Sequence, residues 1–284
     1  MRFGFIRAEK ANHTVAMLCR VLEVSRQGFY AWLTRPPCER LRIDAAMTRT
    51  IRKVFEKHRH RYGSPRVHLE LREAGVRTSR KRVARVMRQN KLVAKCRRRF
   101  VCTTNSTHQY AAAPNLVARN FTPAAADRVW AADITYVPTR GGWLYLAVIL
   151  DLYSRRVVGW SMQPYIDRRL VLGALRMAVQ ARQPAPGLVH HSDRGVQYAC
   201  DDYRQALAGV GAVPSMSRTG DCWDNAPVES FFSSLKRELF DDTEFASHDA
   251  ARTAIFEYIE VYYNQQRRHS TLGYRTPREY EAAA

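Results

Sequence analysis

The stretch DRVWAADITYVPTRGGWLYLAVILDLYSRRVVGWSM, residues 127–162, decides the fold class. Apolar residues dominate three runs in it, and Gly141 and Gly142 stand between the first two. Such runs, separated by turn residues, predict a three-stranded meander. Helical patterns then alternate with short apolar runs, in the order RRLVLGALRMAVQA, LVHHS, YRQALAGV, AVPSMS and APVESFFSSLKREL. This alternation of strands and helices predicts an α/β domain.

The chain before this domain has only helical patterns. Thr14 and Ser25 each precede a short apolar segment, and both residue types favour the N-cap position. Two short helices joined by a tight turn have the size of a helix-turn-helix, whose second helix would present Arg26 and Gln27 to a major groove. An ordinary helical hairpin fits the same pattern.

A second helical module follows, with helices predicted from Asp44, from Ser64 and after the N-cap Ser79. The third helix has an apolar stripe, and cations surround its other faces: Arg80, Lys81, Arg82, Arg85 and Arg88. Five cations on so short a helix repel each other unless an anion lies nearby. The pattern therefore favours DNA contact over a solvated basic face.

The net charge of +20 is unevenly distributed along the chain. Residues 1–121 include 28 basic and 7 acidic residues, whereas residues 122–284 include 18 basic and 19 acidic residues. A concentration of positive charge in one part of a chain is typical of a segment that binds nucleic acid. No apolar run approaches the roughly 20 residues of a membrane span, and no signal-peptide pattern is present, so we expect a cytoplasmic protein. Six cysteines without a C-x-x-C pair predict reduced, mostly buried thiols.

These patterns predict four segments. A helix-turn-helix-like segment covers 1–40, a second helical DNA-binding module covers 41–95, a linker covers 96–121, and an α/β core with a C-terminal helix and a basic tail covers 122–284. The linker begins with the basic cluster KCRRRF and continues without periodicity. The tail includes Arg267, Arg268 and His269, which either contact DNA or pack against the last helix.

Three carboxylates have unusual positions in the α/β core. Asp133 lies within a predicted strand, Asp193 directly follows the apolar run LVHHS, and Glu229 opens an amphipathic helix. An ionised carboxylate on a core element is costly unless a cation neutralises it, so the three together predict a metal site. Oxygen ligands select Mg²⁺, for which Mn²⁺ can substitute. Each acid alone also fits a structural role, as a strand-edge residue, an N-cap or a first-turn partner of the helix dipole.

A pair of such ions suits a DNA-binding chain, because two metals about 4 Å apart assist both the attacking and the leaving oxygen in phosphoryl transfer. Lys236 lies seven residues after Glu229, about 20° from it around the helix and about 10 Å along the axis. Lys236 is therefore a candidate for contact with a DNA phosphate. A solvated surface lysine is the alternative.

Several motifs, in their order along the chain, resemble one family. The three acids lie in WAADITYV, HHSDRGVQY and DNAPVESFFSSLKRE, with 35 residues between the second and the third, which looks like the D-D-E triad of transposases and retroviral integrases. More narrowly, these motifs, DLYSRRVVGW and YNQQRRHSTLGYRTPREY are similar to OrfB-type transposases of the insertion sequence 3 family. The resemblance covers nearly the whole chain, since SRQGFYAWL, RYGSPRVHLEL and SRKRVARVMRQNKL look like that family's two DNA-binding modules.

The resemblance implies an RNase H-like core with Asp133 on the first strand, Asp193 after the fourth and Glu229 on a late helix. It also implies a Mg²⁺-dependent enzyme that cuts the terminal inverted repeats of a bacterial insertion sequence and exposes 3′-hydroxyls, which then attack target DNA. The implied partners are DNA, an upstream OrfA product joined by frameshifting, and further copies of the chain on DNA. The implied location is the bacterial nucleoid.

Two other functions are open at this point. One is a DNA-binding regulator of transposition without catalysis, and the other is an RNase H-like nuclease that hydrolyses DNA without joining it. The presence of all three acids on core elements argues against the regulator. The large basic N-terminal half argues against the nuclease, because a DNA reader would be superfluous there.

Overall fold

The computed structural model describes residues 2–36, 38–95, 113–218, 222–240 and 244–284. The chain divides into two compact units, one of Met1–His60 and Val67–Leu92, and the other of Arg61–Arg66 and Val93–Ala284. Most of the predicted linker, residues 96–112, lies outside the described residues. Within the described ranges, no helix is both long enough and apolar enough to cross a membrane.

The first unit is all-α in its described residues. Its helices are α1 (Arg2–Glu9), α2 (Val15–Val21), α3 (Arg26–Thr34), α4 (Glu39–Lys57), α5 (Ser64–Glu73) and α6 (Arg80–Gln89). The hydroxyls of Thr14, Ser25 and Ser79 accept backbone N–H groups at the starts of α2, α3 and α6, so these predicted N-caps are confirmed.

Two features of this unit were not predicted. Helix α1 has no apolar stripe in its sequence and is held by Ile6, which packs in one cluster with Phe29. Helix α4 begins at Glu39, before the predicted start at Asp44. The sequence pattern missed this start because exposed apolar residues in the first turns, Leu41 and Ile43, obscure the helical period. Among the described cysteines, Cys19 is buried, Cys200 is half-buried and Cys38, at the N-cap of α4, is exposed.

The second unit contains a five-stranded sheet with the strand order β3-β2-β1-β4-β5. Strands β1, β2 and β3 are antiparallel and form the predicted meander, whereas β4 and β5 run parallel to β1. The strands are β1 (Val129–Thr139), β2 (Gly142–Asp151), β3 (Val157–Gln163), β4 (Val189–Ser192) and β5 (Val213–Met216). The glycine turn is confirmed, because Thr139 pairs with Gly142, which has a positive φ of 100°.

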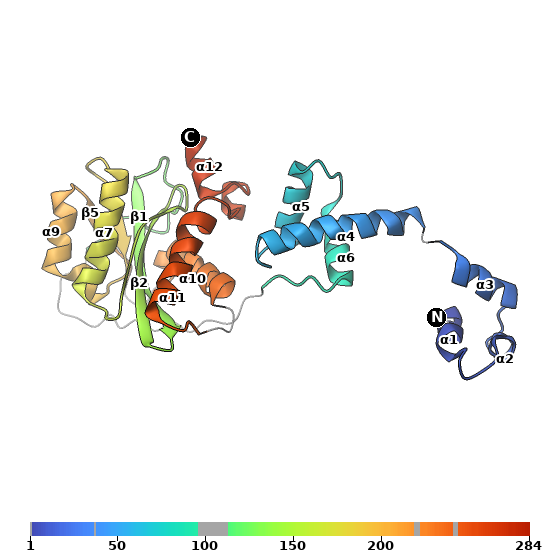
Figure 1. Ribbon diagram of the computed structural model, residues 1–284. Helices are drawn as coiled ribbons and strands as arrows, with labels where there is room; N and C mark the ends of the chain where they lie inside the picture. Colours follow the sequence, from blue (N-terminus) through green and yellow to red (C-terminus); the bar gives the residue numbers. More distant parts are fainter. Residues whose placement is uncertain (1, 37, 96–112, 219–221, 241–243) are drawn as a thin grey trace. The chain divides into compact units, whose positions relative to one another are not determined.

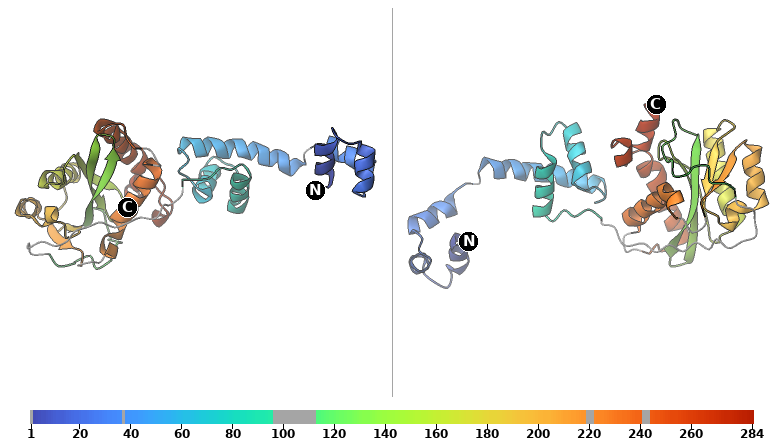
Figure 2. Two further views of the ribbon diagram at one scale, coloured as in Figure 1. Left: turned by 90° about the horizontal axis from the view of Figure 1, so that it is seen from below. Right: turned by 180° about the vertical axis from the view of Figure 1, so that it is seen from behind.

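Helices cover both faces of this sheet (Figure 1). On one face lie α7 (Arg168–Arg182), α8 (Val196–Ala199) and α9 (Asp201–Gly209), and on the other lie α10 (Ala226–Leu239) and α11 (His248–Phe256). The views of Figure 2 show the same layers. Trp130 and Ala132 belong to the core cluster on the α7 side. Because side chains alternate along a strand, Asp133 faces the side of α10.

After α11 the chain continues as a π-helix over Glu257–Tyr263, a 3-10 turn over Ser270–Leu272 and α12 (Pro277–Ala282). The π-helix was not predicted, because the run FEYIEVYY has enough apolar residues to fit an ordinary helix. Its tyrosines surround a buried ion pair between Glu238 and Arg267, whose closest atoms are 2.8 Å apart. Arg267 of the predicted basic tail is therefore structural, as one of the two interpretations stated.

The segment Arg61–Arg66 packs in the second unit, although it connects α4 to α5 and includes the first turn of α5. Arg61 Nε donates to the carbonyl oxygen of Glu238 at 3.2 Å, and its guanidinium lies 4.3 Å from the ring centre of Tyr262. The fully buried Tyr62 donates its hydroxyl to the carbonyl oxygen of Gln266 at 3.0 Å. This segment interrupts the module predicted over 41–95 and is part of the fold around the sheet.

Candidate active site

Asp133 stands where β1 loses one of its two neighbouring strands. Strand β1 pairs with β2 from Trp130 to Thr139, but its parallel pairing with β4 ends at Ala132, which lies beside Ser192. The next residue on each strand is an aspartate, Asp133 on β1 and Asp193 after β4. The strand register therefore brings the two predicted aspartates to the same edge of the sheet.

Glu229 comes to this edge from the first turn of α10. Just before the helix, the buried Asn225 donates its side-chain N–H to the carbonyl oxygen of Ala132 at 3.0 Å. This bond ties the start of α10 to the residue directly before Asp133. Asn225 occupies the N-cap position of α10, but its side chain makes no capping hydrogen bond and contacts strand β1 instead.

The three carboxylates interact electrostatically. Burial raises the pKa of Asp133 well above its ordinary value, and the negative charges of Asp193 and Glu229 raise it further. The backbone N–H of Ile134, 2.7 Å from Asp133 Oδ1, and the charge of Lys236 act in the opposite direction. Burial also raises the pKa of Glu229. Partly buried, mutually repelling carboxylates are the type of oxygen donor set that a hard divalent cation neutralises.

In the described structure, Asp133, Asp193 and Glu229 are not arranged as a complete metal-binding site. No three Asp, Glu, His or Cys side chains among the described residues are grouped closely enough to hold one metal ion. Asp133 Oδ1 accepts from Ile134, and Asp193 Oδ1 accepts from the backbone N–H of Gly195 at 2.9 Å. The donor set fits a divalent cation by its chemistry, and its role as a ligand set stays a prediction.

Lys236 lies two turns along α10 from Glu229, as its spacing predicted. Its Nζ lies 4.4 Å from the ring centre of Tyr136 on β1. Burial lowers the pKa of Lys236 to about 8, and the nearby charge of Asp133 opposes this shift. On the same helix Val228, Phe232 and Leu235 are buried, which agrees with the predicted amphipathic helix.

A buried carboxylate, Asp224, organises the segment that leads into α10. Asp224 is fully buried and accepts hydrogen bonds from Arg218, Asn115 and Arg119 at 2.8–3.1 Å. Its pKa is held well below the ordinary value, chiefly by the side-chain hydrogen bonds from Arg218. Asn115 and Arg119 lie in the predicted linker, where no sequence pattern indicated a contact with the core.

In the first unit, the predicted DNA-contacting residues divide into two groups. Arg26, Gln27, Arg80, Lys81 and Arg88 are exposed. By contrast, Arg82 and Arg85 are half-buried, and each donates at 2.8 Å to the carboxylate of Asp44 on α4. The cations of α6 were expected to need a nearby anion, and DNA was the predicted one. For Arg82 and Arg85, Asp44 of the same chain is such an anion.

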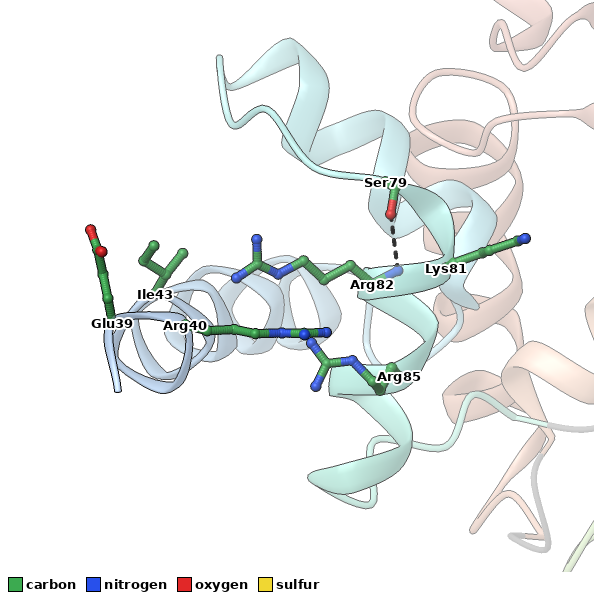
Figure 3. Close-up of a pocket in the computed structure, with 7 residues that line it drawn as sticks. All are labelled: Glu39, Arg40, Ile43, Ser79, Lys81, Arg82 and Arg85. Carbon is green, nitrogen blue, oxygen red and sulfur yellow. Dashed lines mark hydrogen bonds between the residues drawn. The ribbon is translucent and has the colours of Figure 1, made fainter. Parts of the chain in front are cut away.

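Arg82 and Arg85 also line a cleft between α4 and α6, together with Glu39, Arg40, Ile43, Ser79 and Lys81. Figure 3 shows Arg40, Arg82 and Arg85 directed into the same space between the two helices. The cleft measures about 630 Å³. Cations from two helices therefore contribute to one basic surface.

Comparison with known proteins identifies the family. Models described as "Integrase core domain" match residues 123–222 and 210–277, and a model described as "HTH-like domain" matches residues 42–100. The chain is 39% identical to the transposase InsF for insertion sequence IS3A of Escherichia coli K12, over 99% of this chain and 98% of that protein. The chain belongs to the IS3 family of transposases. It is also 44% identical to an uncharacterized 31 kDa protein of insertion element IS600 from Shigella sonnei, over 92% of this chain and 96% of that protein.

Two solved structures are among the similar ones. One is the simian T-cell lymphotropic virus intasome in complex with PP2A regulatory subunit B56 gamma, with 14% identity, a TM-score of 0.47, and coverage of 81% of this chain and 73% of that chain. The other is the HTLV-2 integrase catalytic core domain in complex with magnesium, with 16% identity, a TM-score of 0.42, and coverage of 56% and 98%.

The transposase has the RNase H-like core that the sequence predicted, preceded by helical modules. As an IS3-family transposase it is an enzyme of the polynucleotidyl transferase type. The family resemblance stated from the motifs is thereby confirmed. The individual catalytic and DNA-contacting residues remain predictions.

Proposed function

We propose that this transposase cleaves DNA at the ends of a bacterial insertion sequence and joins the exposed 3′ ends to target DNA, with Asp133, Asp193 and Glu229 holding two Mg²⁺ ions. The observation that carries the proposal is the strand register, because Ala132 lies beside Ser192 and an aspartate follows each. The bond from Asn225 to Ala132 supports the inclusion of Glu229.

In this proposal the residues of the chain have distinct tasks. The three carboxylates supply anionic oxygens, and the repulsion of Asp133 by the other two favours a shared cation. Divalent ions bound there would activate the attacking oxygen and stabilise the leaving oxygen. Asn225 keeps α10 against β1. The ammonium group of Lys236 attracts a phosphate near the site.

The test is incubation of the full chain with a labelled DNA end, target DNA and Mg²⁺. We expect cleaved and then joined products, which disappear with a chelator and return when Mg²⁺ or Mn²⁺ is added. Binding without cleavage would indicate the regulator, and cleavage that never leads to joining would indicate the nuclease.

The helical modules are proposed to read the DNA ends. The exposure of Arg26 and Gln27 at the start of α3 supports a contact with base edges. The exposed Arg80, Lys81 and Arg88 support phosphate contacts from α6. Within this proposal Asp44 orients Arg82 and Arg85, so that they contribute to the basic cleft of Figure 3 from a fixed position.

Lys81→Ala is expected to weaken binding to all DNA sequences about equally. Removing one phosphate contact should lower the slope of log K against log salt by about one unit, because one fewer counterion is released. Titration of labelled DNA at several salt concentrations measures the slope. Arg176→Ala on α7, an exposed residue of the core and the same loss of charge, is the matched control and should leave the slope unchanged. Equal slopes for all three proteins would contradict the assignment of Lys81.

Lys236→Ala is expected to slow joining of the DNA end and to lower the salt slope by about one unit, with metal binding unchanged. The reason is that Lys236 shares a helix face with Glu229 and lies about 10 Å from it along the axis. Joining assays and salt titrations on the same preparation measure both effects. A variant that joins DNA at the wild-type rate, with an unchanged slope, would make Lys236 an ordinary surface lysine.

The partners and the domain division are also proposals. We propose that the chain acts on the nucleoid as a homo-oligomer on DNA, and that an upstream OrfA product is joined to it by frameshifting. We keep the predicted domains and add the segment Arg61–Arg66 to the core, supported by its contacts with Glu238 and Gln266. Terminal inverted repeats and an overlapping upstream frame in the flanking DNA would support the fusion, and an isolated frame would contradict it.

A further inference from the structure

Two exposed aromatic side chains lie further along β1 and β2 from the sheet edge that carries Asp133 and Asp193, which we call the carboxylate edge. Tyr136 on β1 is 37% exposed and Trp143 on β2 is 51% exposed. Their ring centres are 5.1 Å apart, with the ring planes at 86°. Large aromatic side chains usually bury most of their surface, so two exposed rings in contact suggest a surface for a ligand.

The rings lie at a distance from the carboxylates that a nucleic acid can bridge. Tyr136 is three residues after Asp133, about 10 Å along an extended strand, and this odd spacing places the two side chains on opposite faces of β1. Lys236 links them past the strand, because its charge acts on Asp133 and its ammonium group contacts the Tyr136 ring. Lys236 is about 10 Å from Glu229 along α10. Strand β1 runs from Asp133 to Tyr136, and helix α10 runs from Glu229 to Lys236. The second residue of each pair lies close to the other, because Lys236 Nζ is 4.4 Å from the Tyr136 ring centre. The separation of about 10 Å within each pair corresponds to about three base steps of DNA.

No strand of the described part of the chain covers this side of β1. Pairing with β4 ends at Ala132, and the next backbone contact on this side is the bridge between Thr139 and Phe245. Among the described residues, the backbone of β1 between these points therefore has no strand partner on this side, from Asp133 past Tyr136. Two aromatic rings with an adjacent ammonium group match the chemistry of a nucleotide strand, because bases stack on rings and phosphates attract the cation.

We propose that Tyr136 and Trp143 form a stacking platform for unpaired bases at the end of the DNA substrate, with Lys236 at the adjoining phosphate. This inference rests on the proposed function and names the part of the DNA that the site holds. A paired base in a duplex has neighbours on both faces, so stacking on the platform requires a terminal or unpaired nucleotide. The platform would keep the two strands of the DNA end apart, while the last phosphate of the DNA lies at the carboxylates.

The first test uses the full chain and a DNA end with 2-aminopurine, a fluorescent base, at successive terminal positions. Wild-type protein and the conservative variant Trp143→Phe should quench the fluorescence at one or two positions, and Trp143→Ala should not. We expect Trp143→Ala to slow joining by on the order of tenfold, the size of one lost base–aromatic stack, with an unchanged salt slope because no charge is removed. Phe256→Ala is the matched control, because Phe256 is also 51% exposed but contacts Trp160 on the edge strand β3.

The second test replaces the quenched base with an abasic nucleotide. Wild-type protein should then lose as much joining activity as Trp143→Ala loses on intact DNA, and the combination should lose no more than either change alone. Additive losses, unchanged fluorescence, or wild-type joining on the abasic end would overturn the platform. So would a change of oligomeric state in Trp143→Ala, which would assign the rings to a protein contact. Absence of joining by the wild-type protein itself would instead refute the proposed function.

Discussion

Asp133→Asn, Asp193→Asn and Glu229→Gln are each expected to abolish cleavage and joining while leaving binding to DNA ends nearly intact. An amide keeps the shape of the carboxyl group but loses the charge that holds a divalent cation. We expect a loss of roughly 10³-fold or more, the scale seen when electrostatic stabilisation of a transition state is removed. Gel assays of cleaved and joined products, with DNA binding measured in parallel, give the two readouts.

The matched control for these three variants is Asp249→Asn, the same chemical change at a side chain that is 92% exposed. It should cleave and join at the wild-type rate. Near-normal joining by any one of the three site variants would show that its residue is wrongly assigned. Loss of DNA binding together with activity would point to misfolding, which thermal unfolding of each variant would reveal.

Arg267→Met is expected to lower the free energy of unfolding by about 3–5 kcal/mol, because it leaves the buried Glu238 carboxylate without its closest cation. The two side chains are 4% and 2% exposed. Glu238 also accepts from the hydroxyl of Tyr258 at 3.0 Å, and its backbone carbonyl accepts from Arg61. The loss should therefore extend to the docking of the segment Arg61–Arg66. Urea denaturation followed by tyrosine and tryptophan fluorescence measures the change.

A double variant distinguishes the cost of a broken pair from a loss of packing. Glu238→Leu combined with Arg267→Met removes both charges, so it should recover most of the lost stability. Arg252→Met, which breaks an exposed pair with Asp249, is the control and should have little effect. A double variant as unstable as Arg267→Met would show that packing, and not charge, dominates at this position.

The same pair predicts how stability depends on pH. Burial alone would raise the pKa of Glu238, but the charge and hydrogen bonds of Arg267 hold it below the ordinary value of 4.5. A carboxyl group with a lower pKa in the folded state adds stability above its unfolded pKa, and this stability is lost as the pH falls through the folded value. The wild-type protein should therefore lose stability below about pH 4.5, and the double variant should lose less.

Local pattern alone determined much of the fold. The apolar runs of residues 127–162 with the Gly141–Gly142 turn gave the meander, because a strand's period of two and a tight turn are properties of neighbouring residues. The N-caps at Thr14, Ser25 and Ser79 were readable for the same reason. The motifs around the three acids were sufficient to identify the family, since their order along the chain is itself sequence information.

Only the tertiary structure decided which distant residues support one another. Asp44 on α4 pairs with Arg82 and Arg85 on α6, and Glu238 pairs with Arg267. The sequence alone does not show which of these charged residues form pairs. The bond from Asn225 to Ala132 and the contact of Lys236 with Tyr136 likewise join elements far apart along the chain. Sequence periodicity records how a residue is placed on its own helix or strand, whereas these contacts depend on how the helices and strands pack, and no local pattern encodes them.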